Sequence, residues 1–89
     1  MNDDYEQLLA QLRRESLWPA LYFFKFIIPA DLKKIALIES RFSEKAIISL
    51  HESSKGKYVS VSIKEIMPTP ESVVDKYKQM GDIEGLMAF

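Results

Sequence analysis

Cysteine is absent from the 89-residue sequence. The chain therefore has no disulfide framework, no thiol nucleophile and no thiolate ligand for a metal ion. An excess of one charge is missing as well, because 12 basic and 13 acidic residues leave a net charge of −1. Proteins dedicated to nucleic acids usually carry a basic excess or a basic stripe. A nucleic-acid partner is therefore not expected.

Long hydrophobic runs are also missing. The longest, residues 17–28, is broken by Pro19 and Lys25 and is shorter than the roughly 20 residues that a membrane-spanning helix needs. The acidic start, residues 1–5, lacks the cationic stretch that opens a signal peptide. With 47% hydrophobic and 28% charged residues, the composition is that of one folded domain. We expect a cytoplasmic protein that does not associate with membranes.

The first pattern that the sequence does contain is an amphipathic helix. Residues 3–14 predict it, because apolar side chains recur there at the helical period. These side chains are Tyr5, Leu8, Leu9 and Leu12. We treat residues 1–16 as a helical extension and residues 17–89 as the main domain.

Three segments alternate between apolar and polar side chains as strands do. In residues 21–28, an outward Lys25 directs its alternate neighbours to the core. The inward set of this strand is Tyr22, Phe24, Phe26 and Ile28. Residues 45–52 and 57–66 alternate in the same way, and the turn chemistry between them predicts a β-hairpin. Their inward sets are Ala46, Ile48 and Leu50, followed by Val59, Val61 and Ile63.

Two further segments carry helix signals. Residues 30–41 predict a helix whose apolar stripe consists of Leu32, Ile35, Ala36, Ile38 and Phe42. A second helix begins at Pro70 with Thr69 as its N-cap, and Gly81 is expected to end it in the left-handed conformation. Residues 82–89 predict a last strand. Its expected inward side chains are Ile83, Met87 and Phe89.

The order of these elements predicts the fold class. Strand, helix, strand, strand, helix and strand form an α+β, ferredoxin-like βαββαβ sandwich. In this sandwich a four-stranded antiparallel sheet carries two helices on one face, because both crossovers are right-handed. The first and third strands are expected at its centre.

The hairpin carries a specific sequence motif. From Ser53 to Ser62 the chain matches, position by position, the run S-S-K-G-x-Y-x-S-V-S of the YbeD-like proteins. Residues 24–26 and 73–83 are similar to the same family, so the resemblance spans residues 18–89. These are small bacterial proteins of unknown function that resemble ACT-type regulatory domains in fold. The resemblance implies a regulatory role by fold analogy and implies no catalytic residue.

The turn of the hairpin is one candidate binding site. Its residues are Ser53, Ser54, Lys55 and Gly56. Their hydroxyls, ammonium group and backbone amides could hold a carboxylate or a phosphate. A solvated hairpin turn is the simpler interpretation of the same residues.

The outward face of the sheet is the other candidate. Tyr58, Ser60 and Ser62 form a hydroxyl-bearing row on it. Apolar side chains are expected on the same face, namely Phe23, Ile27, Ile47 and Leu86. A solvated face is common in antiparallel sheets, but an uncovered apolar patch usually has a partner. We hypothesise that the N-terminal helix or a second copy of the protein covers it.

Signatures of catalysis and metal binding are not found. His51 is the single histidine and has neither carboxylates at ligand spacing nor a nucleophile beside it. Hydrolases of the acylphosphatase type share the topology but need an arginine in the loop after the first strand. Residues 28–31 of this chain are Ile-Pro-Ala-Asp. We expect no enzyme, no metal and no cofactor.

The sequence therefore favours a non-catalytic regulatory or protein-interaction module. Its expected partner is a second copy or another protein, with a small-molecule effector as a further option. The alternative is a single-stranded RNA-binding module that uses the open sheet face. RNA-recognition motifs place aromatic residues after Lys/Arg-Gly, whereas Lys57 and Val59 stand at those positions here.

Overall fold

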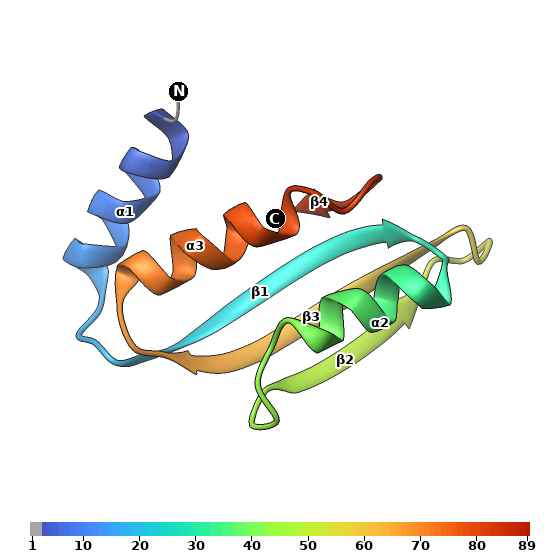
Figure 1. Ribbon diagram of the computed structural model, residues 1–89, viewed down its shortest axis with the longest axis horizontal. Helices are drawn as coiled ribbons and strands as arrows, with labels where there is room; N and C mark the ends of the chain where they lie inside the picture. The colour runs from blue at the N-terminus through green and yellow to red at the C-terminus, as the bar shows by residue number, and fades with distance from the viewer. Residues whose placement is uncertain (1–2) are drawn as a thin grey trace.

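The computed structural model describes residues 3–89. Its helices are α1 (Asp3–Glu15), α2 (Leu32–Ser40) and α3 (Pro70–Met80), and its strands are β1 (Ala20–Pro29), β2 (Ile47–Glu52), β3 (Tyr58–Met67) and β4 (Met87–Ala88). The order after α1 is βαββαβ, which confirms the predicted α+β, ferredoxin-like arrangement (Figure 1). Residues 1 and 2 of the predicted extension lie outside the described part of the chain.

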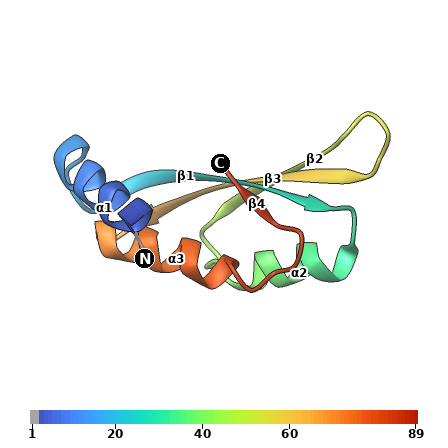
Figure 2. The same ribbon diagram turned by 90° about the horizontal axis from the view of Figure 1, so that it is seen from above.

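The four strands form one antiparallel sheet in the order β2-β3-β1-β4. The central strands β1 and β3 pair along their whole length, from Ala20 opposite Met67 to Pro29 opposite Tyr58. Helices α2 and α3 lie on the same side of the sheet, and neither crosses its other face (Figure 2). The sheet therefore has one packed face and one open face, as predicted.

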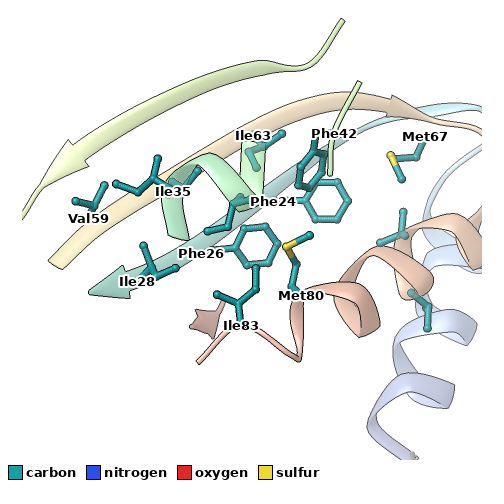
Figure 3. Close-up of a cluster of buried hydrophobic side chains, with 14 of the residues drawn as sticks. Phe24, Phe26, Ile28, Ile35, Phe42, Val59, Ile63, Met67, Met80 and Ile83 are labelled. Carbon is teal, nitrogen blue, oxygen red and sulfur yellow. The ribbon is translucent and has the colours of Figure 1, made fainter. Parts of the chain in front are cut away.

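The core lies between the sheet and the helices (Figure 3). Phe24, Phe26 and Ile28 of β1 are buried, and so are Val59, Val61 and Ile63 of β3. Phe42, just after α2, packs edge-on against Phe24 with ring centroids 5.2 Å apart. Because a large apolar side chain contributes about 1.5–3 kcal/mol when fully buried, this cluster fixes which face of the sheet points inward.

Short polar side chains set the starts of both crossover helices. Asp31 is the N-cap of α2, and its carboxylate accepts a hydrogen bond of 2.9 Å from the Lys33 N–H. The predicted cap at Thr69 is confirmed, because its hydroxyl accepts from the Ser72 N–H at 3.1 Å. Pro70 follows at the first helical position, where no N–H is needed.

Helix α1 packs against α3 and runs antiparallel to it (Figure 1). Arg13 forms an ion pair with Glu71 at one end of the pair of helices, and the Lys78 ammonium lies 5.4 Å from the Tyr5 ring centroid at the other. Leu12 is buried in the main core cluster. Helix α1 therefore packs beside α3 at one end of the sheet and does not cover the open sheet face (Figure 2).

The predicted inward sets were wrong at three places in α2 and β2. Leu32 is 84% exposed and Ala36 is exposed, because the short α2 turns only Ile35 and Ile38 into the core. Leu50 is half-exposed, since β2 is an edge strand that α2 covers incompletely.

The C-terminal prediction was also partly wrong. Gly81 keeps a right-handed conformation with φ −65°, and the chain then forms turns instead of a strand. Pairing begins only at Met87, after Gly85 has taken φ +84°. Ile83 is buried as predicted, whereas Met87 and Phe89 are exposed. Leu86, predicted on the open face, packs against the core cluster instead.

Candidate binding surfaces

The open sheet face consists of alternate residues of all four strands. They are Leu21, Phe23, Lys25 and Ile27 of β1, Ile47, Ser49 and His51 of β2, Tyr58, Ser60, Ser62, Lys64 and Ile66 of β3, and Met87 of β4. The strand registers bring all the predicted residues of this face together except Leu86. Phe23 and Ile47 are each 63% exposed and Ile66 is 66% exposed. This face therefore exposes apolar side chains at many points, and no element of the described chain covers it.

The registers arrange these side chains in rows across the strands. Ile47, Lys64 and Phe23 form one row, and the Lys64 ammonium lies 5.8 Å from the Phe23 ring centroid. The next row holds Ser49, Ser62 and Lys25, and the row after it holds His51, Ser60, Ile27 and Met87. Small hydroxyl-bearing residues thus occupy the middle of the face, with large apolar residues on both sides.

The serines leave two hollows between the larger side chains. One has a volume of about 240 Å³ and lies beside Phe23, Ile47 and Ser62. The other has a volume of about 270 Å³ and lies beside Ile27, Tyr58 and Ser60. Each hollow can receive a bulky side chain of a partner, as the pockets around interface anchors do.

The charge of the open sheet face is one-sided. Lys25 and Lys64 stand on its central strands, and no aspartate or glutamate is among the strand residues that define it. Alternation in the sequence places Lys25 outward, but neither lysine is among the candidate site residues predicted from it. Leu21, Ile66 and Met87 are also outside that set. Alternation alone could have found all of them except Met87, whose orientation depends on where β4 begins.

The hairpin turn projects beyond the body of the sheet (Figure 2). Gly56 has φ +71°, which a glycine adopts without strain. Its N–H donates to the Ser53 carbonyl at 2.9 Å, and the Ser53 hydroxyl accepts from the Tyr58 N–H at 3.1 Å. The Gly56 amide, one donor that an anion site would use, is therefore engaged within the turn. The Ser53 hydroxyl only accepts, so its own hydrogen is not used by that bond, and Ser54 and Lys55 are exposed.

Neither the histidine nor any other described residue forms a metal-binding cluster. Among residues 3–89, no three His, Asp or Glu side chains lie close enough to share a metal ion. His51 is exposed on the open sheet face. Within the same residues, no helix has the length and apolar character that crossing a membrane requires.

Comparison with known protein families identifies the family to which the chain is similar. The model of a family described as "Protein of unknown function (DUF493)" matches residues 28–89. No curated protein and no solved structure matches the chain. The matched region contains the Ser53–Ser62 motif on which the YbeD-like resemblance depends, and YbeD-like proteins belong to this family. The chain is therefore a member of the DUF493 family.

Proposed function

We propose that this protein is a non-catalytic binding module whose open sheet face docks on a partner protein. The observation that carries the proposal is the exposed apolar set, represented by Phe23, Ile47 and Ile66, on a face that no described helix covers. Patches of this kind on small proteins usually mark interaction sites. A regulatory role would follow if docking controls the activity of the partner.

The charge of the face favours a different protein over a second copy. A two-fold pair of copies would place Lys25 and Lys64 of each copy opposite a face that also carries only positive charge. Like charges at an interface oppose association, whereas a complementary partner is attracted. The partner that fits therefore presents apolar side chains for the two hollows and carboxylates for Lys25 and Lys64.

An experiment with charge reversals tests this proposal. Tagged wild-type protein and the double variant Lys25→Glu/Lys64→Glu are used to capture partners from native lysate at low and high ionic strength. Lys33→Glu, on the exposed side of α2, is the matched control. We expect a stoichiometric partner with wild type and Lys33→Glu, weaker capture in high salt, and no capture with the double variant.

Sizing of the purified protein completes the test. Equal capture by wild type and the double variant would contradict docking through this face. A concentration-dependent dimer that the double variant loses would favour a second copy as the occupant.

RNA binding is the alternative function that the fold allows. Base stacking needs aromatic side chains on the central strands. On the open sheet face Phe23 is the aromatic residue of β1. Tyr58 is the first residue of β3, and the residues that follow it on this face are Ser60, Ser62 and Lys64. We expect no saturable binding of a fluorescent oligouridine in polarisation measurements. Tight binding that weakens with salt would contradict the protein-partner proposal and identify RNA as the ligand of this face.

A further inference from the structure

The outer edge of β1 is only partly paired. Strand β4 pairs with Phe26 and Ile27, and the Phe89 N–H donates to the Lys25 carbonyl at 2.9 Å. Alternate residues of a strand direct their backbone groups to the same side. The N–H and C=O groups of Leu21 and Phe23 therefore point to the same edge as those of Lys25, and no other described residue pairs with them.

A groove runs beside this unpaired stretch. It has a volume of about 470 Å³, within the roughly 300–1,000 Å³ of typical ligand sites, and its lining includes Tyr5, Leu8, Tyr22, Tyr77, Leu86 and Phe89. Helix α1 supplies one wall and the C-terminal segment supplies the other. The free edge of β1 thus borders an apolar groove between α1 and the C-terminal segment, and we call the edge and this groove together the slot.

Exposed strand edges attract other strands, and proteins usually block them with charges, prolines or covering elements. The edge from Leu21 to Phe24 carries none of these blocking residues and spans roughly 13 Å at about 3.3 Å per residue. Its unpaired backbone groups match those of another extended chain. The slot therefore combines the two elements of strand addition, backbone pairing and a pocket for alternate side chains.

We infer that this slot binds an extended peptide segment of a partner protein, which adds as a strand to the free edge of β1. One set of its side chains is apolar and enters the groove over Tyr22 and Tyr77, and the other set lies beside Leu21 and Phe23. Asp4 contributes the one charged side chain among the described groove residues, and it is exposed. Charge complementarity with Asp4 therefore predicts that the peptide contains a lysine or an arginine. This inference is independent of docking on the open sheet face.

A free segment fits the slot better than a folded second copy. The β1 edge of a second copy is itself flanked by α1 and β4, whereas an extended segment carries no such walls into the slot. Pairing β2 of one copy with β1 of the next would not close and would produce growing assemblies. Sedimentation at several concentrations detects such assemblies.

The first measurement uses wild-type protein alone. Amide hydrogen exchange followed by NMR should show the Leu21 and Phe23 N–H groups exchanging about tenfold or more faster than those of Tyr22 and Phe24, which point to β3. Slow exchange at Leu21 and Phe23 in the free protein would overturn the inference, because the edge would already be occupied.

The second measurement adds a ligand. Peptides selected from a phage-displayed random library of about eight residues, long enough to span the free edge, are synthesised and added to the protein. We expect them to carry a basic residue and to slow exchange at Leu21 and Phe23 by about tenfold or more. Failure to select any peptide, or peptides that leave these two amides unchanged, would also overturn the inference.

Variants then locate the site. Leu8→Arg fills the groove and should abolish binding, and Asp4→Lys should weaken it by about threefold, as expected for an exposed ion pair. Ile47→Lys, on the open sheet face, is the control and should bind as wild type does. If the NMR spectrum of Leu8→Arg is not that of a folded protein, the site is tested by the affinity of Asp4→Lys and by the exchange of the Leu21 and Phe23 amides. Loss of binding in Ile47→Lys alone would place the peptide on the open sheet face and contradict the slot.

Discussion

The hydroxyl oxygen of Tyr22 lies 3.0 Å from that of Tyr77, so β1 and α3 are joined by a hydrogen bond at the edge of the core. The rings also pack edge-on, with centroids 6.3 Å apart. Burial and this hydrogen bond both raise the pKa of Tyr77 above its usual value. The fold therefore favours the neutral phenol.

A loss of stability at alkaline pH follows. Because the folded-state pKa is raised, the contribution of Tyr77 is complete below the unfolded value near 10 and is lost as the pH rises above it. Tyr77→Phe should cost about 1 kcal/mol at pH 7 through the lost hydrogen bond and should show a shallower alkaline decline than wild type. Urea unfolding between neutral and strongly alkaline pH measures both effects. Parallel pH profiles would contradict this role for Tyr77.

The two unlike faces of β1 allow a matched comparison of phenylalanines. Phe26 is fully buried, so Phe26→Ala should lower the free energy of unfolding by about 3–5 kcal/mol. Phe23 is 63% exposed, so Phe23→Ala should change it by less than about 0.5 kcal/mol. Denaturant melts provide the measurement. A large loss in Phe23→Ala would mean that the open sheet face is already covered in the isolated protein, as in a dimer.

Two glycines with positive φ differ in the space around them. A Cβ on Gly85 would lie 2.9 Å from Cγ of Pro29, whereas one on Gly56 would have nothing within 4 Å. Gly56→Ala should therefore lower the free energy of unfolding by only about 1–2 kcal/mol, the strain of holding alanine in the left-handed conformation. Gly85→Ala should lower it by more, because the clash with Pro29 is added. Gly85 also lies two residues before the start of β4, so the NMR chemical shifts of Met87 and Ala88 should change in Gly85→Ala. Equal costs would indicate that Pro29 moves aside.

Arg41 connects the end of α2 to the segment after α3. Its guanidinium donates to both carboxylate oxygens of Asp82, at 2.7 and 3.3 Å, and to the Gln79 carbonyl. The hydrogen bond from Arg41 lowers the pKa of Asp82. The stabilising contribution is therefore complete above the unfolded value of roughly 4 and is lost as the pH falls through the lower folded value. Between neutral pH and about pH 2, wild type should lose more stability than Asp82→Asn, and thermal melts at each pH measure the difference.

The contribution of α1 can be measured with a pair of leucines. Leu12 is buried in the core cluster, and Leu12→Ala should cost about 2–3 kcal/mol, at the low end for a buried leucine. Leu17 is 92% exposed, so Leu17→Ala is the control and should stay within about 0.5 kcal/mol. If both variants are as stable as wild type, α1 is a separate extension that docks without stabilising the domain.

The elements that sequence predicted well are those whose signals are local. Alternation in β3 and the cap at Thr69 follow from the period of a strand and from side-chain hydrogen bonding to a helix start. The failures depend on tertiary context. The exposure of Leu32 and Leu50 reflects how far α2 reaches over an edge strand, and a local pattern does not contain that distance.

The candidate sites show the same division. The open sheet face could be predicted, because alternate residues of neighbouring strands share a side whichever way the helices pack. The groove beside Tyr22 could not, since it exists only because β4 is short and α1 stands against α3. Sequence showed the amphipathic pattern of α1 but not the neighbour against which it packs.

The central β1–β3 ladder also has a kinetic consequence. It joins residues separated by the whole of α2 and β2, from Pro29 opposite Tyr58 to Ala20 opposite Met67. The entropy of closing that loop must be overcome before the inward phenylalanines find their partners, so folding should be limited by a nucleus that joins these two strands. A one-residue slip of this ladder would turn Lys25 inward and Phe24 and Phe26 outward. The same alternation that separates the packed face from the open sheet face thus disfavours the nearest misfolded register.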